Sequence, residues 1–504
     1  MNKNIKDVKN FTSKIKASDF DEAVVRPPKT PKNPSPRASV NTAKLALRLL
    51  APTSEQGLGL NIVATSGRFM IYDPKTGVWS NNAEETIKHK LASDLLVYDY
   101  TPNIGANVSE TIATLTRISD MFPVQSLGKV AFKNGTYDYM TDTFVAGWSV
   151  DDYNRHQIPH NYVPFKTAPN FFGWLTTQLG GNEDLVTFIK QWIGYQFYSS
   201  YDIQQFLFLM GVGGSGKSTL LNIIQTIIGD GGFSNVGIHE LNDRKSFQSY
   251  NLDGKLANFD ADIKSEYIGE LDAIKKLTGQ DRVMADIKFK EPISFVNTAK
   301  ATFVMNARLT VTDMNGELRR RMLVCEMNTP VSEETKAKYP SSKFVDEIEG
   351  IISESVAAFR EVIVEAQHSS ESMSFINVPE MDKWRDDWIE GSDNVAQFLE
   401  SAFDEPNKGM VIYKDDKGEI EAEELFLRFR LYAHTMGIRS VYSKAKFYDK
   451  VEALGYKKKQ GYREIFVVRD ESIFRTGHMY GAKSKKARTV FKGLCNAWSV
   501  NHMN

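Results

Sequence analysis

A glycine-rich loop is the clearest chemical feature of this sequence. It runs from Gly211 to Ser218 as GVGGSGKS, between the apolar run 206–210 and a segment with helical spacing at 219–228. Glycines have no Cβ, so such a loop can curve closely round phosphate oxygens. Its amides then point inward together with the positive end of the following helix. The spacing predicts a nucleotide site, with Lys217 on the β- and γ-phosphates and the Ser218 hydroxyl on Mg²⁺. The residues expected to contact the nucleotide are Gly211, Gly213, Gly214, Ser215, Gly216, Lys217, Ser218 and Thr219.

Two carboxylates follow another apolar run further along the chain. Asp260 and Asp262 come directly after Leu256–Phe259, and an uninterrupted strand would place both on one face. Mg²⁺ is usually held by one or two carboxylates together with substrate phosphates. The pattern predicts that one acid orients Mg²⁺ and the other polarises the attacking water, without assigning the two roles. The alternative is that both acids belong to a loop.

A polar amide and three arginines complete this set. Asn306 follows the apolar run Ala301–Met305, and open α/β folds bind ligands at the carboxyl ends of strands. We expect Asn306 to position the lytic water, although asparagine is also common after strands. Arg319, Arg320 and Arg321 precede a further apolar run. An arginine delivered to the γ-phosphate in cis or from a neighbouring subunit stabilises transition-state charge; the alternative is a solvated basic turn.

A basic segment with an aromatic residue lies between the acids and Asn306. Lys288 and Lys290 flank Phe289. Ammonium groups that bind phosphate, placed beside a stacking surface, are the ingredients of single-strand binding. The alternative is an exposed charged hairpin.

The elements around these residues favour a parallel α/β sheet, because apolar runs alternate with helical segments. Segment 170–201 has helical spacing, and 344–368 is typical of one long helix. Residues 1–40, which are basic and proline-rich, are expected to form a solvated tail, the alternative being an arm on nucleic acid or a partner. The expected divisions are the tail at 1–40, an α+β domain at 41–165, a helical lead-in at 166–200, the motor core at 201–330, a helical segment at 331–391, a winged-helix-like domain at 392–470 and a basic extension at 471–504.

The predicted C-terminal domain has its own signature. Residues 422–436 and 443–454 have the spacing of two helices, the second capped by Ser443, and a basic turn leads to a strand at 465–468. Two helices and a basic hairpin are typical of a winged helix-turn-helix that binds DNA. The alternative is a ring-capping or protein-docking module. The lysines of the turn are Lys457, Lys458 and Lys459.

Composition narrows the class of protein. The chain has 504 residues and a net charge of −1, which excludes a uniformly cationic coat protein. Its two cysteines, Cys325 and Cys495, make neither a disulfide framework nor a four-cysteine zinc site. Residues 1–20 lack the apolar core of a signal peptide, and no apolar run approaches the 18 or so residues of a membrane span. We expect a protein of the cytoplasm without a membrane partner.

The ordered motifs resemble the superfamily 3 helicases, an AAA+ branch found in viruses, phages and plasmids. The closest likeness is to the helicase half of phage and plasmid primase–helicases, and it extends over roughly residues 60–470. The matching strings are Gly211–Thr219, Gly254–Asp262, Lys275–Asp281, Lys288–Pro292, Phe303–Asn306 and Asp313–Arg321.

The resemblance implies an AAA+-type P-loop motor that couples ATP hydrolysis with Mg²⁺ to DNA unwinding during replication of a phage, plasmid or genomic island. It implies that Lys217 and Ser218 form the Walker A pair, that Asp260 and Asp262 are the Walker B acids and that Asn306 is the sensor. Arg321 or Arg320 would reach a neighbour's ATP, which implies a homo-hexamer. Lys288 and Lys290 would grip single-stranded DNA in the channel of the ring.

Three departures qualify this resemblance. The second Walker B position is Asp262 where many relatives use glutamate, and the triple arginine leaves the finger ambiguous. The region before the motor holds no three-carboxylate primase constellation, so we expect a helicase without priming activity in a bacterial host cytosol, with a separate primase as a candidate partner.

Two other functions stay open. One is an origin-binding initiator in which ATP mainly drives assembly and origin melting, and the C-terminal domain binds double-stranded origin DNA. The other is a packaging or remodelling ATPase.

Overall fold

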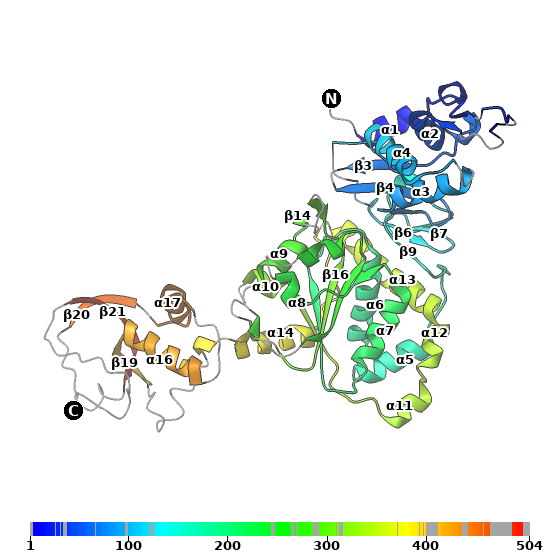
Figure 1. Ribbon diagram of the computed structural model, residues 1–504. Helices are drawn as coiled ribbons and strands as arrows, with labels where there is room; N and C mark the ends of the chain where they lie inside the picture. Colours follow the sequence, from blue (N-terminus) through cyan, green and yellow to red (C-terminus); the bar gives the residue numbers. More distant parts are fainter. Residues whose placement is uncertain are drawn as a thin grey trace. The chain divides into compact units, whose positions relative to one another are not determined.

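Five short runs of the chain pair into one parallel sheet, four of which the sequence predicts (Figure 1). The order is β11-β12-β16-β10-β18 and every pair is parallel, so the carboxyl ends of the strands share one edge. β10 is buried along its whole length, as expected of a strand covered on both faces. The strands are β10 (Phe206–Met210), β11 (Phe233–Ser234), β12 (Ala257–Ile263), β16 (Lys300–Met305) and β18 (Met322–Glu326).

The computed structural model describes residues 4–25, 27–30, 32–33, 38–65, 67–95, 99–119, 122, 125–242, 247–263, 267–268, 271–285, 292–308, 310–311, 316–369, 371–392, 394–396, 398–399, 412–435, 442–456, 458–463 and 486–496. The chain divides into two units. The first comprises Met1–Lys264, Asp272–Ala307 and Arg321–Met381, and holds the parallel sheet. The second comprises Ser265–Leu271, Arg308–Arg320 and Asp382–Asn504.

Helices cover both faces of the parallel sheet (Figure 1). On one face the Trp192 indole of α6 donates to Thr302 Oγ1 of β16 at 3.1 Å, and α13 packs against both α6 and α7. On the other face α8 and α9 pack over Ala301 and Phe303 of the same strand, as alternation along β16 requires. The helices are α5 (Pro169–Gln178), α6 (Glu183–Phe197), α7 (Lys217–Ile228), α8 (Ile238–Asn242), α9 (Asp272–Thr278), α11 (Glu333–Lys338), α12 (Ser342–Asp346) and α13 (Ile348–Ser369), and β14 (Arg282–Ala285) pairs antiparallel with β15 (Ile293–Val296).

The structure divides the predicted helix at 344–368 into α12 and α13, with Glu347 between them. The Glu347 carboxylate accepts the backbone amides of Asn170 at 3.2 Å and Phe171 at 2.9 Å, at the start of α5. Negative charge stabilises a helix N-terminus. The single-helix prediction was therefore wrong at the residue that caps α5, while the predicted lead-in helices at 170–201 are confirmed as α5 and α6.

Two further sheets precede this parallel sheet: β3-β4-β5 is antiparallel, and β8-β7-β6-β9 is mixed because β6 pairs parallel with β9. Short turns join neighbouring strands in both sheets, with Asp73 opposite Val78 across one turn and Phe132 opposite Gly135 across the other. The elements are α2 (Thr42–Leu50), β3 (Ile62–Thr65), β4 (Arg68–Asp73), β5 (Val78–Ser80), α3 (Ala83–Asp94) and α4 (Pro102–Leu115), then β6 (Lys129–Phe132), β7 (Gly135–Asp138), β8 (Thr143–Ala146) and β9 (Gln157–Ile158).

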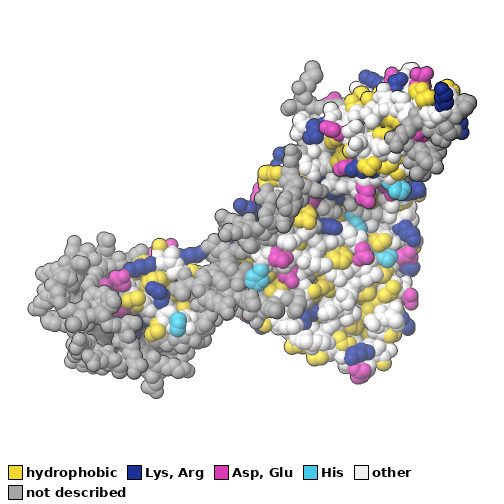
Figure 2. All heavy atoms as spheres, viewed as in Figure 1, with side chains coloured by type: hydrophobic (Ala, Val, Ile, Leu, Met, Phe, Trp, Pro, Cys, Tyr) yellow, Lys and Arg dark blue, Asp and Glu magenta, His cyan; other side chains and the backbone are white. Residues whose placement is uncertain are grey.

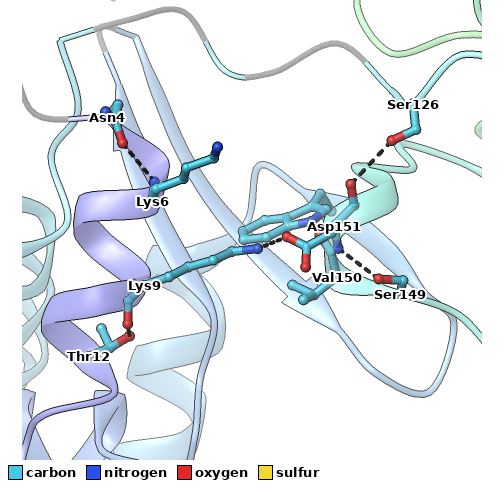
Figure 3. Close-up of polar contacts among 9 residues, drawn as sticks. Asn4, Lys6, Lys9, Thr12, Ser126, Ser149, Val150 and Asp151 are labelled. Atoms are coloured by element: carbon cyan, nitrogen blue, oxygen red, sulfur yellow. Dashed lines mark hydrogen bonds and ion pairs between the residues drawn. The ribbon is translucent and has the colours of Figure 1, made fainter.

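The prediction of a solvated tail over residues 1–40 was wrong for residues 4–25. Helix α1 (Ile5–Thr12) begins with a capping box between Asn4 and Asp7, buries Val8, and pairs Lys9 with Asp151 (Figure 3). Further on, β1 (Val24–Val25) pairs with β2 (Ser39–Val40). Composition alone did not predict the ordered structure of this segment, because its few apolar side chains are widely spaced in the sequence. These side chains nevertheless join the core of the following domain. The buried ones are Val8, Ile15, Phe20 and Ala23.

The second unit carries a three-stranded antiparallel sheet, and helices α16 and α17 are among its other described elements. The order is β19-β21-β20, and the Ser443 hydroxyl accepts the Lys446 amide at 3.3 Å, which confirms the predicted cap. β21 (Lys486–Asn496) is the central strand, so the prediction of a separate extension at 471–504 was wrong; the predicted strand at 465–468 lies outside the described residues. The other elements are β19 (Ile412–Glu421), α16 (Ala422–Thr435), α17 (Lys444–Ala453), β20 (Lys458–Arg463), β13 (Tyr267–Ile268), β17 (Thr310–Val311), α10 (Gly316–Arg321) and α14 (Pro379–Ser392).

No helix within the described ranges is both long enough and apolar enough to cross a membrane. On the face seen in Figure 2, the basic side chains of the described atoms are scattered among acidic and apolar ones. On this face the described basic side chains therefore form no broad patch.

Candidate nucleotide-binding site

The glycine-rich loop joins β10 to α7, the setting that the sequence predicts. Gly211 has φ +143° and Gly216 has φ +95°, backbone angles that residues with a side chain rarely adopt. A Cβ on Gly211 would lie 1.9 Å from the Met327 carbonyl oxygen, and a Cβ on Gly216 would lie 2.6 Å from the Trp174 ring. Helix α7 begins at Lys217, and no side chain caps it. Its first amides are therefore free to meet an anion at the positive end of the helix.

Lys217 lies inside the curve of this loop. Its side chain is 6% exposed, and Nζ donates to the carbonyl oxygens of Gly211 at 2.6 Å and Val212 at 2.9 Å. Burial lowers the pKa of this ammonium group. A cation this poorly hydrated gains more from an anion than an exposed lysine would. The geometry therefore suits a phosphate between Lys217 and the loop amides.

The ends of the neighbouring strands lie level with this loop. Met210 pairs with Met305 of β16 and with Glu326 of β18, and Met305 pairs with Ile263 of β12. Asn306, which is exposed, therefore begins beside the loop on the adjacent strand. The structure brings Asn306 and the end of β12 to the edge where the loop begins.

The two acids of β12 do not follow simple alternation. A bulge shifts the register between Asp260, opposite Phe303, and Ile263, opposite Met305. An extra residue at this point breaks the period of two, so simple alternation no longer predicts that both acids share a face. Asp260 Oδ2 accepts the Ile238 amide at 2.8 Å, at the start of α8. The side chain of Asp262 lies outside the described residues.

The residues at this edge fit Mg²⁺ as a donor set. Ser218 is exposed on the first turn of α7, and β12 supplies carboxylate oxygens. These are hard oxygen ligands of the kind Mg²⁺ takes, with phosphates completing the shell. No group of three histidine, cysteine or acidic side chains elsewhere in the described chain is placed to hold a metal alone.

Of the three arginines, Arg321 lies in the first unit, at the opposite edge of the sheet. Arg321 directly precedes Met322, which pairs with Phe206 at the amino end of β10. The length of β10, roughly 13 Å at 3.3 Å per residue, separates this position from the loop. Arg321 is 5% exposed and its Nη1 donates to Thr278 Oγ1 at 2.8 Å. Arg320 is exposed, whereas Arg319 pairs with Asp386 at 2.7 Å in the second unit.

Several predicted DNA contacts fall outside the described residues. Lys288, Phe289 and Lys290 are among them, although the flanking strands β14 and β15 pair as a hairpin, as predicted. Lys457 is also outside. Lys458 and Lys459 begin β20, and their side chains are not described.

Sequence reasoning missed a set of contacts that hold the N-terminal domain to the region of the parallel sheet. Asp253, just before β12, accepts Arg68 Nη2 at 2.6 Å and Arg155 Nη2 at 3.2 Å. His156 Nε2 lies 2.7 Å from the Ile228 carbonyl oxygen and His160 Nε2 lies 2.9 Å from that of Thr226, both at the end of α7. Arg68 and Asp253 are 185 residues apart, so no local pattern could have paired them.

Comparison with known proteins adds likenesses over part of the chain. A family of unknown function (DUF5906) matches residues 209–321, from the end of β10 to α10. The uncharacterized mitochondrial protein ymf21 of Marchantia polymorpha is 27% identical over 112 residues, which cover 20% of this chain and 62% of that protein. The chain thus matches less than two thirds of the length of this relative.

Solved structures with some likeness have low scores. The C-terminal region (305–718) of NrS-1 has a TM-score of 0.44 at 12% identity, covering 88% of this chain and 98% of that one. A JCV helicase bound to a thiazolopyridine compound has a TM-score of 0.26 at 14% identity, covering 44% of this chain and 65% of that one. Scores of this size carry no conclusion about the fold or the activity of this chain.

Proposed function

We propose that this chain is an ATP-driven DNA helicase that acts as a ring of identical subunits. The observation that carries the proposal is the loop Gly211–Ser218, which encloses the Lys217 ammonium group between a buried strand and the uncapped start of α7. In the proposed site Lys217 contacts the β- and γ-phosphates of ATP. Ser218 and one acid of β12 hold Mg²⁺, while the other acid and Asn306 orient the attacking water.

The sheet order supports an AAA+-type motor. Strand β16, which ends at Met305, lies between β12 and β10. The side chain of Asn306, the next residue, is therefore placed to reach between the acids and the loop. This is the place for a group that responds to the γ-phosphate. Polar groups on three adjacent strands therefore converge on one ligand, as in open α/β folds.

The place of the arginines supports an assembly. Arg321 lies at the amino edge of the sheet, so it cannot serve the loop of its own chain without crossing the sheet. An arginine that stabilises transition-state charge can come from a neighbouring subunit. Arg321 is buried on Thr278 while Arg320 is exposed, which favours Arg320 as the group that reaches the neighbour. A closed ring of identical subunits, with six as the expected number, places every arginine beside a neighbour's loop.

Single-stranded DNA is the proposed substrate. The hairpin β14–β15 carries Lys288, Phe289 and Lys290 between its strands. Lysines on either side of an aromatic residue provide phosphate contacts and stacking.

Substitution of the loop lysine tests the proposal. Lys217→Ala should lower ATP hydrolysis about a hundredfold or more, because the positive charge that stabilises the transferring phosphate is lost. Strand separation should disappear with it. Lys166→Ala is the control, since Lys166 pairs with Glu349 at 2.7 Å on the surface. Strand separation by a folded Lys217→Ala protein would contradict a helicase driven by this loop.

A second candidate is an initiator that binds origin DNA, and the second unit favours it. Helical residues at 394–396 and 398–399 precede β19, α16, α17, β20 and β21, with the last strand central. This succession agrees with a winged helix-turn-helix in which α17 would enter the major groove. Footprinting of the full chain on replicon DNA tests this candidate: protection of one site that withstands salt and excess unrelated DNA would favour an initiator. Uniform, salt-sensitive binding would favour a helicase alone.

A further inference from the structure

The conformation of the phosphate loop is held from outside by groups that do not belong to the loop. The Val331 amide donates to the Gly214 carbonyl oxygen at 2.9 Å. The side-chain amide of Gln178 faces two carbonyl oxygens, and only the orientation that turns its nitrogen toward them satisfies its hydrogen bonding. In that orientation the nitrogen donates to the Ser215 carbonyl oxygen at 3.1 Å and to that of Thr329 at 3.0 Å. Two successive carbonyls of the loop therefore bond to neighbouring elements.

These outer bonds decide where the inner amides point. The described chain has no cis peptide bond, and in a trans peptide the C=O and the N–H point in opposite directions. Holding the Gly214 carbonyl outward aims the Ser215 N–H into the loop. Holding the Ser215 carbonyl outward does the same for the Gly216 N–H. Successive amides aimed into one concavity form an anion-binding nest.

Helix α5 presents Gln178 to the loop from a fixed position. Trp174 lies one turn earlier, so the two side chains share a face of α5. Both are 3% exposed, and the Trp174 ring lies against Gly216. The chemistry of Gln178 is specific. It bonds two carbonyl oxygens at once, which requires one nitrogen with two hydrogens.

We propose that Gln178 is a positioning residue for nucleotide binding: from α5 it ties the Ser215 carbonyl to Thr329 and so aims the Gly216 amide at the phosphates. This inference rests on the proposed function of the loop as an ATP site. It adds to that proposal a residue outside the loop motif, on a helix that precedes the motor. Glutamate at this position could not donate to either carbonyl, and leucine would fill the space without any bond.

Nucleotide affinity of the full chain tests the role of Gln178. We expect Gln178→Leu to raise the dissociation constant for ATP with Mg²⁺ about tenfold, since a misdirected amide loses one hydrogen bond to a charged group. Gln178→Glu should raise it further. The rate at saturating ATP should fall less than the affinity does, because the reacting groups at the ends of β12 and β16 are untouched.

The matched control is Gln191→Leu on the adjacent helix α6. Gln191 is also a buried glutamine, 6% exposed, and its Oε1 accepts the Ile376 amide at 2.9 Å, away from the loop. Thermal unfolding without nucleotide compares the stability of the two leucine variants. If Gln178→Glu does not fold, Gln178→Leu carries the test. An unchanged affinity in a folded Gln178→Leu protein, or an equal loss in Gln191→Leu, would overturn the inference. Failure of the wild-type chain to bind ATP would instead overturn the proposed function.

Discussion

At the carboxyl edge of the parallel sheet the chain offers backbone groups to a ligand, whereas at the amino edge it holds itself together with buried charges. The loop at Gly211–Ser218 shapes its site with amides and glycines. At the opposite edge, Asp253 precedes β12, Lys300 begins β16 and Arg321 precedes β18, each beside partners from distant segments. Backbone groups can exchange one oxygen partner for another at little cost. Leaving a buried charge without its partner costs several kcal/mol of stability. We therefore infer that the amino edge is the more rigid of the two and keeps the site in position.

The largest effect should come from adding one methyl group to the loop. Gly211→Ala places a Cβ 1.9 Å from the Met327 carbonyl oxygen at φ +143°, so the free energy of unfolding should fall by about 5 kcal/mol, the upper range for one substitution. Gly213→Ala is the control, since its Cβ would meet nothing within 4 Å. Chemical unfolding compares the stability of the two variants, and equal stability would contradict the close approach of the Met327 backbone to the loop.

The next effect should come from the amino edge. Asp253→Asn leaves Arg68, whose side chain is 4% exposed, without its counter-charge. Removal of one partner of a buried ion pair costs about 3–4 kcal/mol, and chemical unfolding should show that loss. Glu333→Gln breaks the exposed pair with Lys336 and should change stability by less than about 0.5 kcal/mol. A similar small change for Asp253→Asn would show that the N-terminal domain is not held by this charge.

A smaller loss is expected where the arginine segment meets α9. Thr278→Val removes the hydroxyl that accepts Arg321 Nη1 at 2.8 Å and donates to the Ile274 carbonyl oxygen at 2.9 Å. The loss of a buried hydrogen bond to a charged group should cost about 2 kcal/mol. Thr116→Val is the control, because that buried hydroxyl makes the same bond four residues back, to Ile112, without an arginine. An equal loss of stability in the two variants, measured by thermal unfolding, would show that the bond between Arg321 and Thr278 does not stabilise the fold.

The smallest effect is a pH dependence from Lys300. Burial lowers the pKa of its ammonium group from 10.5 to about 7. The unfolded chain therefore binds this proton more tightly, so stability should rise with pH between these values and be lost as pH falls toward 7. Nζ of Lys300 faces the rings of Tyr195 and Tyr201 and the carbonyl oxygens of Tyr198 and Thr298. The negative charge of Asp202 acts in the opposite direction from burial and raises the pKa of Lys300.

Unfolding experiments at several pH values test this dependence. Wild-type stability should rise by about 1 kcal/mol per pH unit between about pH 7.5 and 9, and Lys300→Met should lack this slope. Lys190→Met is the control, since Lys190 also lies over a ring, that of Phe172, but pairs with Glu354. A slope that persists in Lys300→Met would assign the proton to another group.

Local patterns predicted the parts of the molecule that local chemistry determines. The glycine-rich loop and the strands at 206–210 and 301–305 each depend on a few adjacent residues. The bulge in β12 is not visible in the same way, because the sequence around Asp260 alternates as a regular strand would. The missed contacts join segments far apart in the chain. Gln178 reaches Ser215 and Thr329, and Arg68 reaches Asp253, only after the sheet has formed.

A subunit-mixing experiment tests the central claim most directly. One chain carries Lys217→Ala. The other carries whichever of Arg320→Ala and Arg321→Ala is folded and inactive alone. If each loop is served by a neighbour's arginine, the mixture should regain ATP hydrolysis, since some interfaces then combine an intact loop with an intact arginine. A mixture that stays as inactive as its components, or full activity of both arginine variants alone, would contradict a site shared between subunits.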